Sequence, residues 1–124
     1  MKEEVRRWWV KAQRDMSDAE YNLNGKRYET AAFLCQQAVE KALKALLIDA
    51  TQGLLKTHDL VELGRLVHLP QPLHKKAQEL TTAYIYSRYP DVRQERDLGP
   101  LVREFLAYTK EVLVWSKKQL SSKN

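Results

Sequence analysis

The chain has 124 residues, of which 44% are hydrophobic and 30% are charged. This length supports one domain with its own core, and the composition is that of a globular protein rather than a disordered one. The one cysteine, Cys35, excludes an intramolecular disulfide and fits a reducing compartment. The start, MKEEVRRWWVKAQRD, lacks the apolar stretch of a signal peptide, and no apolar run is long enough for a membrane span. We therefore expect a cytoplasmic protein with no membrane partner.

The net charge of +5 is spread along the chain, apart from a small basic tail with the sequence KKQLSSKN. Such a distribution fits weak attraction to RNA or nucleotides. Basic and acidic residues cancel in the first 20 residues, and we expect no face that combines a basic block with aromatic side chains. Charge alone therefore predicts no nucleic-acid-binding surface.

Apolar residues recur at spacings of three and four along most of the chain, which predicts helices, and no segment alternates as a strand would. The first predicted helix covers Glu3–Asn24 and ends before Gly25. Its apolar stripe runs through Trp8 and leaves Trp9 beside it.

The second predicted helix covers Tyr28–Thr51, and its apolar arc of roughly 180° suits a central helix between two neighbours. Phe33 and Leu47 lie outside this arc, on the polar side of the helix, where they indicate a partner surface. The other residues that we expect on this polar side are Gln36, Gln37, Glu40, Lys41 and Lys44.

A short helix is predicted over Asp59–Val67, with Asp59 or Thr57 as its cap, and a fourth over Pro72–Arg88. Pro100 suits the first turn of a fifth. Four long amphipathic helices joined by short loops predict an all-α fold, an antiparallel up-and-down four-helix bundle with an additional short helix. We expect a single domain over residues 1–124.

The stretch IYSRYPDV holds the main candidate site. Pro90 forces Tyr89 out of helical geometry, so the fourth helix ends near Arg88. Arg88 continues the inward-facing stripe of this helix, and a guanidinium there needs an anionic partner. That partner is either a carboxylate of the chain, Asp91 or Glu40, or the phosphate of a ligand.

The spacing of the other reactive residues does not predict a catalytic site. His58 and Glu62 stand four residues apart, but no third ligand follows at a predictable spacing, so we expect capping and solvent exposure, with no metal and no cofactor. Cys35 lies in the apolar arc of its helix, and we expect a buried side chain rather than a nucleophile.

The positions of the tryptophans predict that most of them pack against other helices. Trp8 and Trp115 fall on the main stripes of their helices, and we expect them in the core or at an interface. Trp9 lies beside its stripe and is the third candidate interface residue, with Phe33 and Leu47.

Three stretches occur in order on the predicted helices: YETAAFLCQQAVEKALKALL, THDLVEL and YIYSRYPD. Together with WWVKAQRDMSDAEYNL near the start, they resemble a HEPN domain (higher eukaryotes and prokaryotes nucleotide-binding) over about residues 5–118. The resemblance implies a helical bundle, often a homodimer, and a nucleotide ligand such as ATP. Small members are frequently encoded beside a minimal nucleotidyltransferase, MNT, and some such pairs act as toxin and antitoxin.

In toxic members of that family the HEPN protein is a metal-independent ribonuclease, with an arginine followed after four to six residues by a histidine. This sequence departs from that pattern, because Arg88 is followed by YPDVRQE and the last histidine is His74. The RYPD match implies Arg88, Tyr89 and Asp91 as ligand-binding residues, with no catalytic residue.

We therefore expect a nucleotide-binding interaction module that acts with a nucleotidyltransferase. One alternative is a ribonuclease toxin acting on RNA, in which Tyr89 or His58 replaces the missing base. The other alternative is a purely structural dimeric partner.

Overall fold

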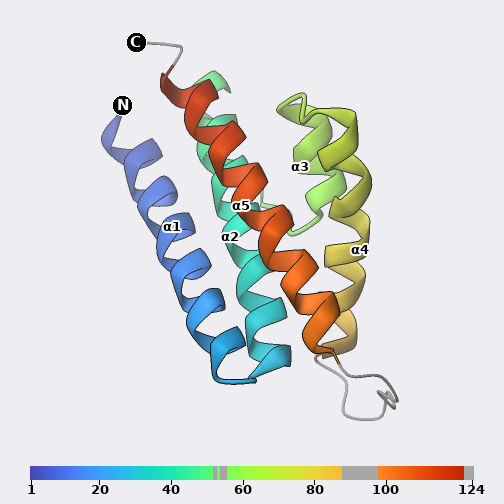
Figure 1. Cartoon of the computed structure of the whole chain (residues 1–124). Coiled ribbons are helices and arrows are strands. Elements are labelled where there is room, and N and C mark those ends of the chain that lie inside the picture. Colours follow the sequence, from blue (N-terminus) through green and yellow to red (C-terminus); the bar gives the residue numbers. More distant parts are fainter. Residues whose placement is uncertain (52, 54–55, 88–97, 122–124) are drawn as a thin grey trace.

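The computed structural model describes residues 1–51, 53, 56–87 and 98–121, with the backbone alone over residues 83–87. Within these residues the regular secondary structure consists of helices alone. The five helices are α1 (Glu3–Asn24), α2 (Tyr28–Thr51), α3 (Leu60–Leu66), α4 (Gln71–Ser87) and α5 (Gly99–Ser121). Figure 1 shows α1, α2, α4 and α5 running alternately up and down, with the short α3 beside α4. The predicted antiparallel bundle with an additional short helix is confirmed. No helix in the described part is long and apolar enough to cross a membrane.

The central helix is α2, which contacts each of the other four helices. The sequence predicted only two neighbours for it. Alanines at Ala31, Ala38, Ala42 and Ala45 are all buried, and their small side chains let the surrounding helices approach closely. As a result, α2 is buried around most of its circumference.

The side of α2 that the sequence predicts to be polar is largely buried. Leu47 is only 7% exposed and belongs to the core, so its expected position on an open polar side is wrong. Gln36, Glu40 and Lys44 are buried as well, and Phe33 is half-buried. The reason is that α1, α3, α4 and α5 together cover more of α2 than two neighbours would. A role of Leu47 in a partner surface stays a prediction. Little of its side chain is accessible for contact with a partner.

The two tryptophans of α1 exchange the positions that the sequence predicts. Trp9 is 7% exposed and packs in the core, whereas Trp8 is half-buried and packs against the core's edge. Trp9 follows Val5 by four residues and precedes Ala12 by three, so it fits the helical period as well as Trp8 does. An interface role for Trp9 stays a prediction, and its burial leaves little surface to carry it.

The turn between α1 and α2 is a Schellman motif, in which one residue adopts a left-handed backbone. The N–H of Arg27 donates to the carbonyl of Asn22 at 2.8 Å, and that of Lys26 to Leu23 at 3.0 Å. The helix ends before Gly25, as predicted, but the left-handed residue is Lys26, with φ of 60°. A lysine thus occupies a position that glycine favours.

The start of α3 is capped by Asp59, one of the two caps that the sequence predicts, and Thr57 supports this cap. The Asp59 side chain accepts hydrogen bonds from the N–H groups of Val61 and Glu62, while the N–H of Asp59 donates to Thr57 Oγ1 at 3.1 Å. These bonds satisfy backbone donors that a helix start leaves free. They also hold the backbone on either side of His58, between Thr57 and Asp59.

The contact of α3 with α4 depends on Gly64. A Cβ atom at this position would lie 2.8 Å from Nδ1 of His74 and 3.2 Å from Cδ2 of Leu69. His74 is half-buried in this helix contact. Glycine is favoured here by space, because a Cβ atom would force the side chains of His74 and Leu69 to shift.

Candidate functional site

The predicted ligand-binding residues Arg88, Tyr89 and Asp91 lie outside the described residues. The described chain stops at Ser87, the end of α4, and resumes at Leu98, next to the start of α5. Both helix ends lie at the end of the bundle that also carries the α1–α2 turn (Figure 1). The segment with the predicted residues therefore joins the described structure at this end.

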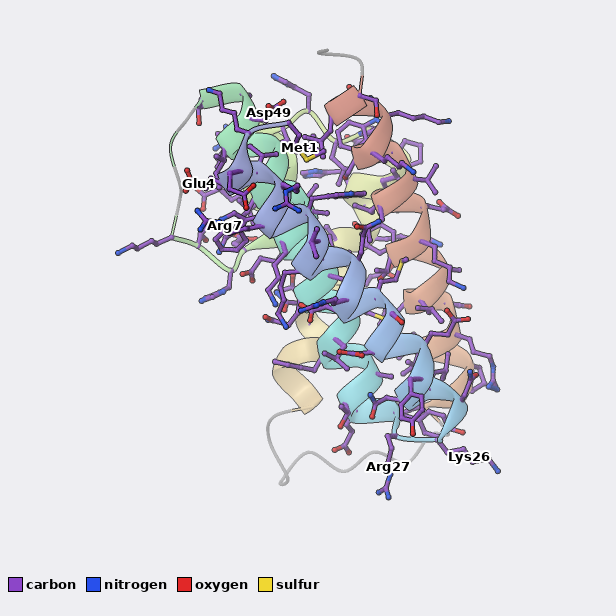
Figure 2. All side chains as sticks on the ribbon, turned by 90° about the vertical axis from the view of Figure 1, so that its left-hand side faces the viewer. Met1, Glu4, Arg7, Lys26, Arg27 and Asp49 are labelled. Carbon is purple, nitrogen blue, oxygen red and sulfur yellow. The ribbon has the colours of Figure 1, made fainter. Side chains whose placement is uncertain are left out.

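A depression of about 310 Å³ lies at the same end of the bundle, and we call it the end depression. Lys26 and Arg27 project from the α1–α2 turn there, away from the helices (Figure 2). The first backbone N–H groups of α2 add positive potential, because α2 begins at Tyr28. These features suit an anion such as a phosphate. The residues that line the depression are Lys26, Arg27, Tyr28, Glu29, Thr30 and Leu98.

A second polar site lies inside the bundle, where Gln36, Glu40 and Lys44 follow one another at spacings of four on α2. We call these three residues the polar column. Lys44 Nζ lies 3.0 Å from Glu40 Oε2, and Gln36 Nε2 lies 3.2 Å from Glu40 Oε1. The side chains of Lys44 and Glu40 are only 6% and 4% exposed. Burying two ionised groups is tolerated only with close pairing and further hydrogen bonds, which the column supplies.

The polar column reaches solvent through His58. Its Nδ1 lies 2.9 Å from Glu40 Oε1, and its side chain is 79% exposed. A carboxylate only accepts hydrogen bonds, so Nδ1 carries the proton in this contact and Nε2 faces away from it. Gln36 also donates to the backbone carbonyl of His58, at 3.4 Å. An oriented, accessible imidazole on a buried carboxylate is an arrangement that general bases use.

The sequence missed this pairing of Glu40 with His58. The sequence indicated Glu40 as a partner for Arg88, and His58 beside Glu62 or as a replacement base, but it did not indicate that the two meet. The signal that it offered was a column of three polar residues at spacings of four, set within an alanine-rich apolar helix. The contact across 18 positions depends on how the α2–α3 connection folds back, which periodicity does not reveal.

Asp15 is a further buried charge that the sequence missed. Its carboxylate pairs with Lys41 of α2, and Lys11 approaches it to 3.5 Å. Asp15 follows Ala12 by three residues and precedes Ala19 by four, so the helical period already placed it on the buried stripe. The ion pair with Lys41 links α1 to α2.

Cys35 is buried, as predicted, and makes a poor nucleophile. Burial raises the pKa of its thiol to about 11, although a hydrogen bond with Thr109 acts in the opposite direction. Because the thiolate is the reactive form, the thiol is inert near neutral pH. Within the described residues, no group of three or more His, Cys, Asp or Glu side chains is placed to hold a metal ion.

Comparison with known proteins identifies the family. Residues 5–120 match the HEPN domain. The chain belongs to the HEPN family. Its fold is similar to that of ST0689, an archaeal HEPN homologue, with 33% identity, a TM-score of 0.76, and coverage of 96% of this chain and 98% of that one. It is also similar to TT1696 from Thermus thermophilus, with 25% identity, a TM-score of 0.82, and coverage of 95% and 99%.

No curated protein matches this HEPN domain. The match over almost the whole chain confirms the family that the four sequence stretches indicated. It supports a module related to nucleotides or RNA. The two sites described above, the end depression and the polar column with His58, are where this HEPN domain gathers charge and chemistry.

Proposed function

We propose that this HEPN protein is a cytoplasmic nucleotide-binding module that acts with a nucleotidyltransferase partner of the MNT type, as part of a toxin–antitoxin pair. The ligand is a nucleotide such as ATP, either free or presented by the partner. The observation that carries the proposal is the end depression at the start of α2, where the two basic residues Lys26 and Arg27 outnumber the one acidic residue, Glu29.

Arg88, Tyr89 and Asp91 are the proposed ligand-binding residues. An arginine suits this role because its guanidinium binds phosphate oxygens in a bidentate manner. The segment that carries Arg88 joins Ser87 to Leu98, and Leu98 itself lines the end depression. On this proposal, Arg27 and Arg88 both bind phosphates of the nucleotide.

Titration with ATP, followed by NMR, tests the proposal. Amide resonances around Arg27 and of the 88–97 segment should shift, and both Arg27→Ala and Arg88→Ala should abolish the shifts. Lys117→Ala removes an exposed charge from α5, and it should leave them intact as a control. Spectra that stay unchanged at millimolar ATP would reject nucleotide binding at this end of the bundle.

A homodimer is the proposed assembly, and Phe33 is the interface residue with the most accessible surface. Phe33 is half-buried, whereas Trp9 and Leu47 belong to the core. Sedimentation equilibrium should report a dimer that Phe33→Ser weakens, with circular dichroism as a check on folding. Co-purification with a nucleotidyltransferase tests the partner. A dimer that binds a partner but no nucleotide would favour the purely structural alternative.

The pair Glu40–His58 favours a second function, a metal-independent ribonuclease acting on RNA. His58 would take the proton from the attacking 2′-hydroxyl, since Glu40 holds its Nδ1 and leaves Nε2 accessible. Arg88 would orient the phosphate. Expression should then arrest growth, and His58→Gln or Arg88→Ala should relieve the arrest. Purified protein should cleave RNA in the presence of a chelator, and harmless expression without a partner argues against this function.

A further inference from the structure

A basic face on α1 lies apart from both sites described above. Arg7, Lys11 and Arg14 follow one another at spacings of four and three, so they share one side of the helix. Lys41 of α2 joins this side because its ammonium pairs with Asp15 of α1. Together, Arg7, Lys11, Arg14 and Lys41 are called the α1 basic face. The sequence predicted no basic block beside an aromatic residue, and this was wrong because Trp8 lies among these side chains.

Two shallow depressions adjoin on this face, since both are bordered by Arg7 and Lys11. The first has a volume of about 300 Å³ and is lined by Arg7, Trp8, Lys11 and Lys41. The second has a volume of about 290 Å³ and is lined by Arg6, Arg7, Val10, Lys11 and Arg14. Each is near the lower limit of the volumes that small-ligand sites have.

The acidic residue at the centre of this face does not neutralise it. Asp15 is buried and faces two ammonium groups, those of Lys41 and Lys11. One carboxylate therefore balances one of the two positive charges and leaves the other in surplus. Lys41 is itself half-buried, so its ammonium is held in a fixed place rather than moving freely in solvent.

The two arginines of the face add to this surplus. Arg7 and Arg14 form no ion pair with any residue that the structure describes. Glu3 is engaged by Arg6 at 2.8 Å, Glu4 lies on the same side of α1 as Arg7 (Figure 2), and Asp18 shares this side because it follows Arg14 by four residues. With Glu4, Asp15 and Asp18 all counted against its four basic residues, the α1 basic face retains an excess of one positive charge.

Trp8 gives the face an aromatic surface of fixed orientation. Lys44 Nζ lies 5.5 Å from the centre of the indole ring and is buried, so it contacts the ring from the protein side. The first depression borders the same indole from the solvent side. A ring held in this way can stack with a planar base without losing conformational entropy on binding.

We propose that the α1 basic face is a second binding site, for a nucleoside phosphate whose base stacks on Trp8 and whose phosphate lies between Arg7, Lys11 and Lys41. This second site rests on the proposed function only for its class of ligand, because the residues of the α1 basic face differ from those of the end depression. Arg7 lies 17 positions before Asn24, the last residue of α1, so roughly 26 Å of helix axis separates Arg7 from the turn at the end depression.

Isothermal titration calorimetry at low salt tests the site, with ATP in one arm and a short single-stranded oligoribonucleotide in the other. The double variant Arg7→Ala/Lys11→Ala should weaken binding by about tenfold or more, since two phosphate contacts are lost. Trp8→Leu keeps an apolar side chain but removes the stacking surface, and it should weaken binding by about tenfold as well. Circular dichroism confirms that the variants fold.

The matched control is Lys75→Ala/Lys76→Ala, which removes two exposed charges from α4. An equal loss of affinity in this control and in Arg7→Ala/Lys11→Ala would mean unspecific attraction and would overturn the site. Loss of affinity in Arg27→Ala alone would overturn it while leaving the proposed function intact. A loss confined to the α1 variants supports it, and the arm with the tighter binding shows whether free nucleotide or an RNA strand is the ligand.

Discussion

Removal of Glu40 should destabilise the bundle strongly, although it deletes a single side chain. Glu40 is the shared acceptor for Lys44 at 3.0 Å, Gln36 at 3.2 Å and His58 at 2.9 Å. Glu40→Ala leaves the ammonium of Lys44 beneath Trp8 without a carboxylate, in a place that is 6% exposed. Breaking a buried pair in this way costs about 3–5 kcal/mol of unfolding free energy.

Urea denaturation followed by circular dichroism measures this loss. With a slope of about 1.5–2 kcal/mol per M, a loss of 3 kcal/mol lowers the midpoint by about 1.5–2 M urea. The exposed pair of Glu20 and Lys110, 3.5 Å apart, supplies the control. Glu20→Ala should cost less than about 1 kcal/mol, because solvent screens this pair.

A double variant separates two effects: the loss of the Glu40–Lys44 ion pair, and the presence of a buried Lys44 ammonium without a partner. Glu40→Leu/Lys44→Met replaces both partners by apolar side chains and should recover most of the stability that Glu40→Ala loses. If Glu40→Ala costs less than about 1 kcal/mol, or the double variant loses as much as the single one, the polar column does not work as described.

Three further changes test the helix ends, the α3–α4 contact and the buried thiol. Lys26→Gly should raise the unfolding free energy by about 1 kcal/mol in a thermal melt, because glycine adopts the left-handed backbone without strain, whereas Lys26→Ala should give no gain. Gly64→Ala should lower it by about 1–3 kcal/mol, since its Cβ would lie 2.8 Å from His74, and adding His74→Ala should restore part of the loss. Burial raises the pKa of Cys35 to about 11 from 9.0, so the folded state keeps a proton that the unfolded state loses. Stability should therefore fall as the pH rises from 9 toward 11, less steeply in Cys35→Ala. Burial raises the pKa of Tyr108 as well, which acts equally in both proteins.

The helices of this fold were predictable because each carries its own signal. The bounds Glu3–Asn24 and Tyr28–Thr51 agree with the structure, since Gly25 and the apolar period mark them locally. Asp59 was recognisable as a cap for the same reason. The rotation of each helix was less predictable, as Trp8 and Trp9 show, because adjacent positions fit a period of 3.6 almost equally well.

The charged groups were harder to place, because their partners come from other elements. Asp15 meets Lys41 across 26 positions, and Glu40 meets His58 across 18. Sequence spacing describes only neighbours on one helix, so it placed Glu40 on the polar side of α2 without its partner His58. The predicted ligand residues around Arg88 stay a prediction, since they lie outside the described residues.

The central position of α2 has a consequence for the dynamics of the domain. A helix that contacts four others opens only when most of the fold opens, whereas α1, with contacts to α2 and α5, has fewer packing contacts to lose. The slowest amide hydrogen exchange should therefore lie in the middle of α2, around Val39 and Leu43, and should report global unfolding. Because Glu40 lies in this same stretch, the exposed His58 makes a direct contact with the part of the chain that is expected to be most protected.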